Sequence, residues 1–268
     1  MRAIKQYFEI YNVEGYDMPS ILKQVEKCGR VSYKSEDKIT EESYKKFFDM
    51  LCSRGHYSPL EFGSIYLTVP LTIVNNDLAE SSWDILRKDS HTKVDVDSYY
   101  YYFSTNLRVI TEYHLEETLK FLTPPTQFHD ERITVKFITN RAISHELVRH
   151  RVFSFIQESQ RYCNYSKEKF GNEVTFITPN WLDTSKTIAK LEWNEAMMNA
   201  EASYILLLQE GLKPQQARVV LPNSCKTEIC MCGFKSDWDK FFALRDSPTA
   251  DPQMQDLVKP LHELTIFK

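Results

Sequence analysis

The chain has 268 residues, of which 42% are hydrophobic and 26% are charged, with a net charge of −4 and an isoelectric point of about 6.0. This composition is typical of a globular protein with a sizeable core, and the acidic balance argues against binding to a nucleic-acid polymer. No apolar run approaches the roughly 18 residues that cross a bilayer, and the N-terminal sequence has no signal-peptide core. We therefore expect a cytoplasmic protein without a membrane partner.

The first third of the chain predicts two helices and a strand. A helix is expected over 17–28, because a proline suits its first turn and apolar residues recur on one face. Thr40 is the expected N-cap of a second helix that runs to Cys52. Apolar and polar side chains alternate over 64–71, which predicts a half-buried strand, and Pro70 places its end at an edge or terminus of the sheet.

The middle of the chain contains two further strand signals. Four consecutive tyrosines at 99–102 could stack on bases, but at this spacing we favour a strand that packs on both faces. A helix is expected near 116–122. A second alternating run at 133–137 predicts another half-buried strand.

The last third predicts a long amphipathic helix over about 185–210 that ends at Gly211. Its apolar stripe would comprise Ile188, Leu191, Met198, Ala202, Ile205 and Leu208. The remaining elements are expected, in order, as a short helix from Pro214 that carries Arg218, a strand over 227–231, and helices over 237–245 and 252–263. A few strands surrounded by long helices predict an α+β fold, and the absence of repeats and Gly/Ser linkers predicts one compact domain.

The segment 141–162 is a basic island in this acidic chain. Arg149, His150 and Arg151 interrupt an apolar run, and the segment holds four arginines against two glutamates. Such an apolar run would normally be buried, and buried cations need an anionic partner. The segment therefore suggests an anion site, with phosphate the favoured anion, and the alternative is a solvated charged face of a helix.

The six cysteines are expected to be reduced thiols. Cys225, Cys230 and Cys232 cluster in sequence, but a zinc site would need a fourth ligand at a compatible spacing. We expect no metal and assign these cysteines to half-buried strand positions.

The string Arg149-His150-Arg151, followed after seven residues by Ser159, resembles the RHR-(x)7-S signature of the flavin-dependent thymidylate synthases. The approach Arg-Ala-x-x-His-x-Leu-Val and the exit Ser-Gln-Arg-Tyr are also typical of that family. Four further segments resemble family motifs in the same order, at 28–35, 56–61, 215–222 and 241–245. The resemblance covers most of the chain outside about 72–130, which implies a single domain over 1–268 with an insertion there.

The resemblance implies reductive methylation of dUMP to dTMP. Methylenetetrahydrofolate would supply the carbon, FAD would carry the hydride, and NADPH would reduce the flavin. It also implies a homotetramer with shared active sites. A physical reason points the same way, because segment 141–162 is too basic to fill one core and too apolar between its charges to face water.

The resemblance also implies roles for individual residues. The expected FAD contacts are Arg149, His150, Arg151 and Lys240. The expected dUMP contacts are Glu146, Arg149, Gln157, Glu158, Ser159, Gln160, Arg161, Arg218 and Arg245. Ser159 would be a substrate contact and not a covalent catalyst, whereas Arg245 would be catalytic, because a fixed cation beside the uracil favours the N3-deprotonated ring.

Several positions depart from the family pattern. Phe62 replaces an expected histidine, Glu146 a glutamine and Lys240 an asparagine, and Thr249-Ala-Asp replaces His-Ala-Gln. Cys225 follows a Leu-Pro pair, a faint resemblance to the nucleophile of the folate-only thymidylate synthases, but its surroundings are not that enzyme's motif. The alternatives are a diverged enzyme that alkylates a pyrimidine nucleotide at C5 and a non-catalytic nucleotide-binding homologue.

Overall fold

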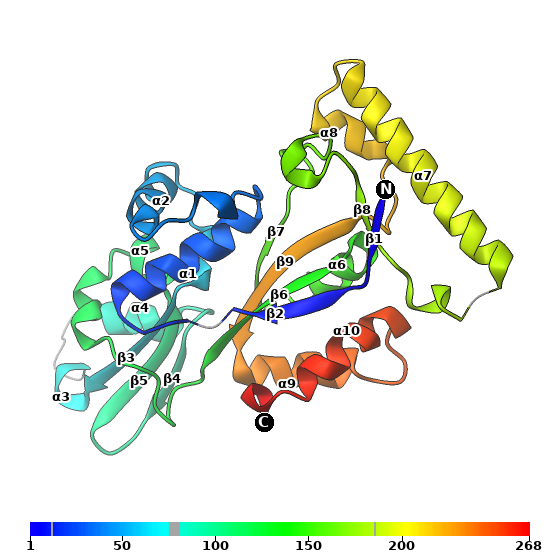
Figure 1. The fold of residues 1–268 in the computed structure, drawn as a ribbon. Coiled ribbons are helices and arrows are strands. Elements are labelled where there is room, and N and C mark those ends of the chain that lie inside the picture. Colours follow the sequence, from blue (N-terminus) through cyan, green and yellow to red (C-terminus); the bar gives the residue numbers. More distant parts are fainter. Residues whose placement is uncertain (12, 75–80, 185) are drawn as a thin grey trace.

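The computed structural model describes residues 1–11, 13–74, 81–184 and 186–268. Its central antiparallel sheet has the order β2-β6-β9-β7 (Figure 1). The strands are β2 (Tyr7–Ile10), β6 (Arg132–Asn140), β9 (Lys226–Phe234) and β7 (Ser154–Gln157). Together with the long helices around it, this sheet confirms the expected α+β class. No helix in the described part of the chain is long and apolar enough to cross a membrane.

The two central strands are covered on both faces. Ile229 and Met231 of β9 pack with Trp238 and Phe241 of α9 (Lys235–Arg245) and with α10 (Pro252–His262). On the opposite face, Cys230 and Cys232 pack against α1 (Met18–Val31). The half-buried strand expected over 133–137 is therefore wrong in its burial, because every residue of β6 is buried. Strand alternation here separates two covered faces, and neither of them is open to water.

A second antiparallel sheet has the order β3-β5-β4. Its strands are β3 (Ser64–Pro70), β5 (Tyr100–Asn106) and β4 (Lys93–Val96). Pro70 does end an edge strand, as expected, but most of β3 is buried and not half-buried. Because β5 lies within 72–130 and pairs with β3 outside that stretch, the stretch is integrated into the surrounding fold.

The four consecutive tyrosines at 99–102 differ in burial. Tyr102 is buried and stacks on Phe128 at 4.6 Å between ring centroids, while Tyr101 packs into the apolar core beneath the sheet. Tyr99 and Tyr100 are exposed. Packing on both faces therefore holds for the second half of the run only.

Helix α1 begins where the sequence indicates, because the Asp17 side chain accepts from the Ser20 N–H at 2.9 Å. The prediction for Thr40 is wrong, since α2 (Ser43–Ser53) begins three residues later. Here the Ser43 hydroxyl accepts from the Thr40 N–H at 2.8 Å and donates to the Thr40 carbonyl at 3.1 Å. These bonds form a local turn that delays the helix.

The remaining short elements complete the fold. The α-helices are α3 (Leu71–Val74), α4 (Ser82–Lys88), α5 (Leu107–Glu112), α6 (Arg141–Leu147) and α8 (Pro214–Ala217), and β1 (Arg2–Ile4) pairs in parallel with β8 (Thr175–Ile177). The 3-10 helices are Glu36–Lys38, Ser58–Phe62, Glu116–Phe121, Glu168–Phe170, Asn180–Leu182, Arg218–Val220 and Thr265–Phe267. The helix expected near 116–122 is thus a 3-10 helix.

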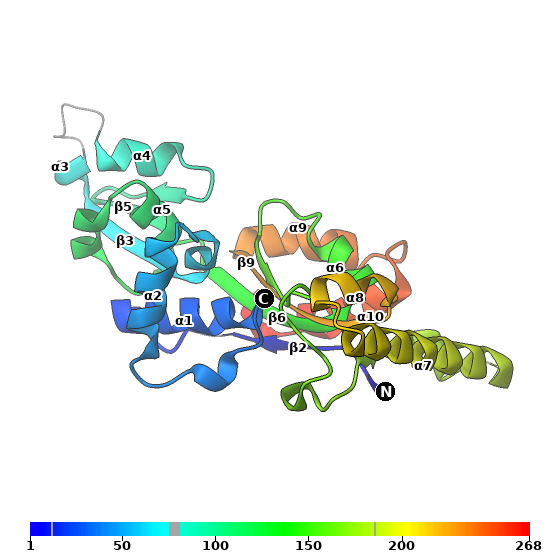
Figure 2. The same cartoon turned by 90° about the horizontal axis from the view of Figure 1, so that it is seen from above.

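Helix α7 (Thr187–Gln209) projects from the body of the molecule (Figures 1 and 2). Gly211 follows it with a φ of +89°, as expected of a residue that ends a helix. The expected stripe does not form this chain's core, because Ile188, Leu191 and Met198 are exposed. Buried contacts come instead from Trp193, Met197 and Tyr204. Residue 185, where the helix was expected to begin, lies outside the described residues.

Candidate active site

The three basic residues lie in a turn between α6 and β7, and not on a helix. Asn140 caps α6 by accepting from the Ile143 N–H at 2.8 Å. After the helix ends, the His150 N–H donates to the Leu147 carbonyl at 3.2 Å and the Phe153 N–H to the His150 carbonyl at 3.0 Å. We call residues 148–153 the basic turn.

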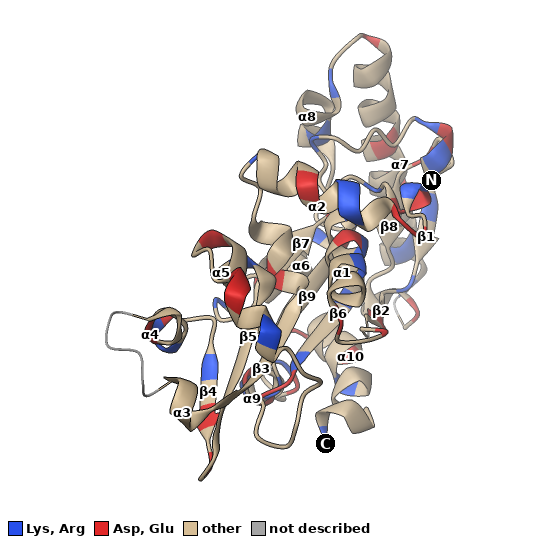
Figure 3. Cartoon of the chain, turned by 90° about the vertical axis from the view of Figure 1, so that its left-hand side faces the viewer, with Lys and Arg blue, Asp and Glu red and all other residues tan. Residues whose placement is uncertain are grey.

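The basic turn exposes both cations and apolar side chains. Arg149 and Arg151 are exposed, and Val152 is 60% exposed, so the expected burial of the whole apolar run is wrong. Within the described part of the chain, neither arginine forms an ion pair. Elsewhere on the surface, acidic and basic residues are interspersed over α1, α2 and α5 (Figure 3). The basic turn therefore presents two uncompensated guanidinium groups.

Arg245, at the end of α9, directs its whole guanidinium group at the end of α6 and the basic turn. Its Nε–H donates to His150 Nε2 at 2.9 Å, its Nη2 to the Glu146 carbonyl at 2.9 Å, and its Nη1 to the Glu146 carboxylate. Burial and the Arg245 charge lower the pKa of His150 to about 4. His150 is therefore neutral at pH 7 and carries its proton on Nδ1, because Nε2 accepts.

A glycine sets the position of the basic turn on the sheet. A Cβ atom at Gly233 of β9 would lie 2.3 Å from the Phe153 ring, which is closer than packed atoms approach. Phe153 also stands edge-on to Trp238, with 4.9 Å between ring centroids. The aromatic residue at the end of the turn therefore fits because position 233 has no side chain.

The following segment, 157–161, has side chains on both faces of the sheet. Gln157 donates through Nε2 to the Ser144 hydroxyl at 2.9 Å and to the Thr227 hydroxyl at 3.1 Å. Glu158 points to the other face and is 2% exposed. The Ser159 N–H donates to the Ser32 carbonyl at 3.0 Å, which fixes the turn to the end of α1.

A cavity of about 410 Å³ opens between α1, α2, the 3-10 helix Ser58–Phe62 and β7. Three segments that are distant in the sequence line it together. The end of α1 contributes Gly29, Ser32 and Tyr33. The 3-10 helix and the residues before it contribute His56, Ser58 and Pro59, and β7 contributes Phe155, Ile156 and Gln157. The volume is within the range of about 300–1,000 Å³ typical of small-molecule sites.

The structure brings some expected site residues together and leaves others apart. Glu146, His150 and Arg245 form one cluster, and Gln157 lines the cavity. Gln160 donates to the Cys225 sulfur at 3.4 Å, and the Arg161 guanidinium lies over the Tyr162 ring. Arg218 lies beyond α8, near α7, while Lys240 is exposed and pairs with Asp237 at 3.0 Å. Among the described residues, neither Arg218 nor Lys240 bonds to the cluster of Glu146, His150 and Arg245.

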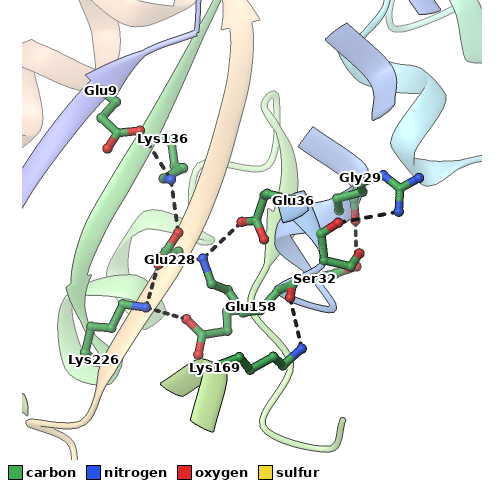
Figure 4. Close-up of polar contacts among 12 residues, drawn as sticks. Glu9, Gly29, Ser32, Glu36, Lys136, Glu158, Lys169, Lys226 and Glu228 are labelled. Atoms are coloured by element: carbon green, nitrogen blue, oxygen red, sulfur yellow. Dashed lines mark hydrogen bonds and ion pairs between the residues drawn. The ribbon is translucent and has the colours of Figure 1, made fainter. Parts of the chain in front are cut away.

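Sequence reasoning missed a buried row of charges behind the 157–161 segment (Figure 4). Glu228 of β9 pairs with Lys34 at 2.9 Å, Lys136 at 3.0 Å and Lys226 at 2.5 Å. Lys226 continues to Glu158 at 2.9 Å. We call this set, with Glu9 and Glu36 at its ends, the charge ladder. Its signal in the sequence is the placement of charged residues at alternate positions of the otherwise apolar strand β9.

The pKa of Glu228 shows how strongly the ladder is coupled. Burial alone would raise this pKa, but the charges of Lys226, Lys34 and Lys136 outweigh burial and hold it well below its usual range. Glu228 therefore remains ionised at neutral pH, with three cations around it.

The cysteines near this sheet are buried, so the half-buried positions expected for Cys225, Cys230 and Cys232 are wrong. Burial, with a smaller contribution from the Glu158 charge, raises the pKa of Cys225 to about 12. Cys225 is thus a thiol at neutral pH and a poor nucleophile. No group of histidine, cysteine and carboxylate side chains in the described ranges is arranged to hold a metal ion.

The sequence model of the family described as thymidylate synthase complementing protein matches residues 114–266. The flavin-dependent thymidylate synthase of Pyrococcus abyssi is 26% identical over 200 residues, which cover 74% of this chain and 76% of that protein.

Two other relatives with the same name match a shorter stretch. Identity is 32% over 126 residues for Pyrococcus horikoshii and 32% over 135 residues for Geobacter sulfurreducens. These matches cover 47% and 48% of this chain and about half of each relative, 51% and 56%. Because the family match covers more than half of the sequence, the chain belongs to the thymidylate synthase complementing protein family.

Proposed function

We propose that this chain is an FAD-dependent thymidylate synthase that converts dUMP to dTMP with methylenetetrahydrofolate and NADPH. One observation supports the proposal most strongly. Residues of the segments 28–35 and 56–61, each of which resembles a family motif, line a single cavity together with Phe155, Ile156 and Gln157, which lie between the Arg149-His150-Arg151 string and Ser159. Chance similarity would not be expected to place these two segments beside the stretch that joins the two halves of the signature, around one small-molecule site.

The residues of the basic turn fit a flavin dinucleotide. Arg149 and Arg151 are exposed and form no ion pair among the described residues, so their planar guanidinium groups can bind a diphosphate. The neutral His150 adds no further charge at pH 7. When bound, FAD would supply the hydride that turns the transferred one-carbon unit into a methyl group. We also propose Lys240 as a flavin contact, which it would make through its exposed ammonium group.

We propose that dUMP lies against the 157–161 segment. Ser159, Gln160 and Arg161 would hold the nucleotide, and Arg218 would contribute a phosphate contact. Arg245 would act on the uracil ring, where a fixed cation stabilises charge that develops on the ring. Because Glu146 already accepts two hydrogen bonds from Arg245, the nucleotide must compete with Glu146 for that guanidinium group.

The proposed enzyme is a homotetramer with shared active sites. The exposed apolar residues of α7 and of the basic turn support this proposal, because such surfaces are normally covered by another subunit. Light scattering should give a mass near four times 31.6 kDa. Since Arg245 bonds to His150 of its own chain, Arg218 is the better candidate for a residue supplied by a neighbour. Mixing inactive Arg218→Ala and Arg245→Ala subunits should restore part of the activity.

The decisive test is release of tritium from C5-labelled dUMP in the presence of methylenetetrahydrofolate, FAD and NADPH. Release should require the folate and the flavin, and dTMP should form in equal amount. Release that continues without folate or flavin would contradict the proposal. A purified protein that takes up FAD and turns yellow, yet forms another C5-alkylated product, would favour the diverged enzyme. A colourless protein that binds only nucleotide would favour the non-catalytic homologue.

A further inference from the structure

We propose that Lys226 is a positioning residue that fixes the nucleotide-binding segment 157–161 through the buried carboxylate of Glu158. The inference rests on the proposed function, because it assumes that this segment holds dUMP. It assigns to the charge ladder a role in substrate affinity and not only in stability.

The Glu158 side chain and the neighbouring Gln157 side chain lie on opposite faces of the sheet. Gln157, the last residue of β7, bonds to Ser144 and Thr227 on one face of the sheet, and Glu158 directly after it points to the opposite face, where it pairs with Lys226. There, one Glu158 oxygen accepts from the Tyr165 hydroxyl at 2.9 Å and the other from Lys226 at 2.9 Å. Because both carboxylate oxygens accept hydrogen bonds and the residue is only 2% exposed, Glu158 anchors the 157–161 segment to the interior of the protein.

The Lys226 side chain is held rigidly by its ion pairs. Its ammonium group lies between Glu158 and Glu228, with its side chain 15% exposed. Glu228 is fixed in turn by Lys34 and by Lys136. Ion pairs in such a row hold one another in place, because moving one member leaves its neighbours without a partner in a low-dielectric interior.

The charge ladder reaches both backbone supports of the 157–161 segment, which are the end of α1 and strand β9. Lys34 follows α1, and the neighbouring Ser32 carbonyl accepts from the Ser159 N–H. The Glu158 N–H donates to the Glu228 carbonyl at 2.8 Å. Figure 4 shows Lys226 joined to both Glu158 and Glu228, with Lys136 on the other side of Glu228. Glu158 is thereby held through its side chain and its backbone, and Ser159 through its backbone. These bonds fix the position from which the next side chains, Gln160 and Arg161, would contact a ligand.

The chain offers a matched control in Lys136. Both lysines are largely buried and both pair with Glu228, but Lys226 pairs with Glu158 and Lys136 pairs with Glu9. Removing either lysine should destabilise the ladder, whereas only loss of Lys226 should free the nucleotide-binding segment.

The test is dUMP affinity of the full-length protein in its native assembly, measured by calorimetry on wild type, Lys226→Met and Lys136→Met. We expect Lys226→Met to weaken dUMP binding at least about tenfold and Lys136→Met to weaken it less than about threefold. Lys226→Arg should recover most of the affinity, because a guanidinium group can still bridge two carboxylates. FAD uptake should remain unchanged in all three variants.

A double-mutant cycle with Glu158→Gln separates positioning from a direct contact. If Lys226 acts through Glu158, the losses in affinity should not add in the Lys226→Met/Glu158→Gln double variant. Additive losses would overturn the inference, as would equal dUMP affinities of Lys226→Met and Lys136→Met. Should Lys226→Met fail to fold, Tyr165→Phe removes the other bond to Glu158 and must also weaken dUMP binding. A wild-type protein that does not bind dUMP would overturn the proposed function itself.

Discussion

The two antiparallel sheets of this protein use their buried faces differently. In the central sheet, β6 and β9 bury Lys136 and Glu228, which pair with each other at 3.0 Å. The described strands of the β3-β5-β4 sheet bury no charged side chain, and their core is made by residues such as Leu67, Val69 and Phe103. Lys136 and Glu228 thus belong to the charge ladder behind the 157–161 segment, whereas the described strands of the second sheet rely on apolar packing.

The largest expected effect tests this contrast directly. Glu228→Gln should lower the free energy of unfolding by about 3–5 kcal/mol, because three lysines lose their common anionic partner. The folded-state pKa of Glu228 lies below its usual value of 4.5, so its contribution is present above pH 4.5 and is lost as pH falls through the lower value. Urea unfolding should therefore show that the difference in free energy of unfolding between wild type and Glu228→Gln becomes smaller below pH 4.5.

The matched control lies in the other sheet. Leu67→Ala should cost a similar amount, about 2–5 kcal/mol, by leaving a cavity. Its cost should not change with pH, because no charge is involved. Equal pH dependence in the two variants would remove the distinction between the sheets.

The next effect concerns activity. Arg245→Lys should preserve the fold and lower the rate of dTMP formation by about 10²-fold or more, because lysine cannot reproduce the three directed bonds to Glu146 and His150 or the planar cation at the ring. Steady-state rates at saturating dUMP, with circular dichroism as a check on folding, would measure this. Turnover near the wild-type rate would exclude Arg245 from the chemistry.

Gly233→Ala should have an intermediate effect, lowering stability by about 1–3 kcal/mol through overpacking. The added methyl group would lie 2.3 Å from the Phe153 ring, so the basic turn must shift. The double variant Gly233→Ala/Phe153→Leu should recover part of the loss, since the smaller side chain makes room. Thermal unfolding of the single and double variants would show whether the ring is the obstacle.

Cys225→Ser should have the smallest effect, a loss of activity below about tenfold, or about 1.4 kcal/mol in the barrier. The high pKa of the buried thiol makes it a poor nucleophile, and the proposed reaction requires no protein nucleophile. Complete loss of dTMP formation in a folded Cys225→Ser protein would instead point to covalent attack by this sulfur.

The sequence predicts local features of this molecule better than distant ones. The first helix and the end of α7 at Gly211 follow from capping and turn preferences, which act over a few residues. The burial of β6 on both faces could not be predicted, because alternation does not reveal whether the second face meets water or another helix. The prediction that the apolar stripe of α7 forms part of the core was wrong for a related reason. Periodicity shows which side chains share a face of a helix, but not what packs against that face.

In the candidate site, too, local features could be predicted from the sequence and contacts between distant residues could not. The basic turn is recognisable because its motif is contiguous, but the contact of Arg245 with His150 joins residues 95 positions apart. No spacing rule connects them. For the charge ladder, the sequence shows the alternate charged positions of β9 but not their partners, because strand register decides that Lys136, Lys226 and Glu228 meet.

The contact of Gly233 with Phe153 has a consequence for the history of the family. Because the ring occupies the space of a missing side chain, the two positions cannot diverge independently. Lineages that keep an aromatic residue at the equivalent of 153 should retain glycine at 233, and lineages that replace the ring should be free to lose the glycine. Correlated replacement of this pair across relatives would show that the position of the basic turn on the sheet constrains both residues.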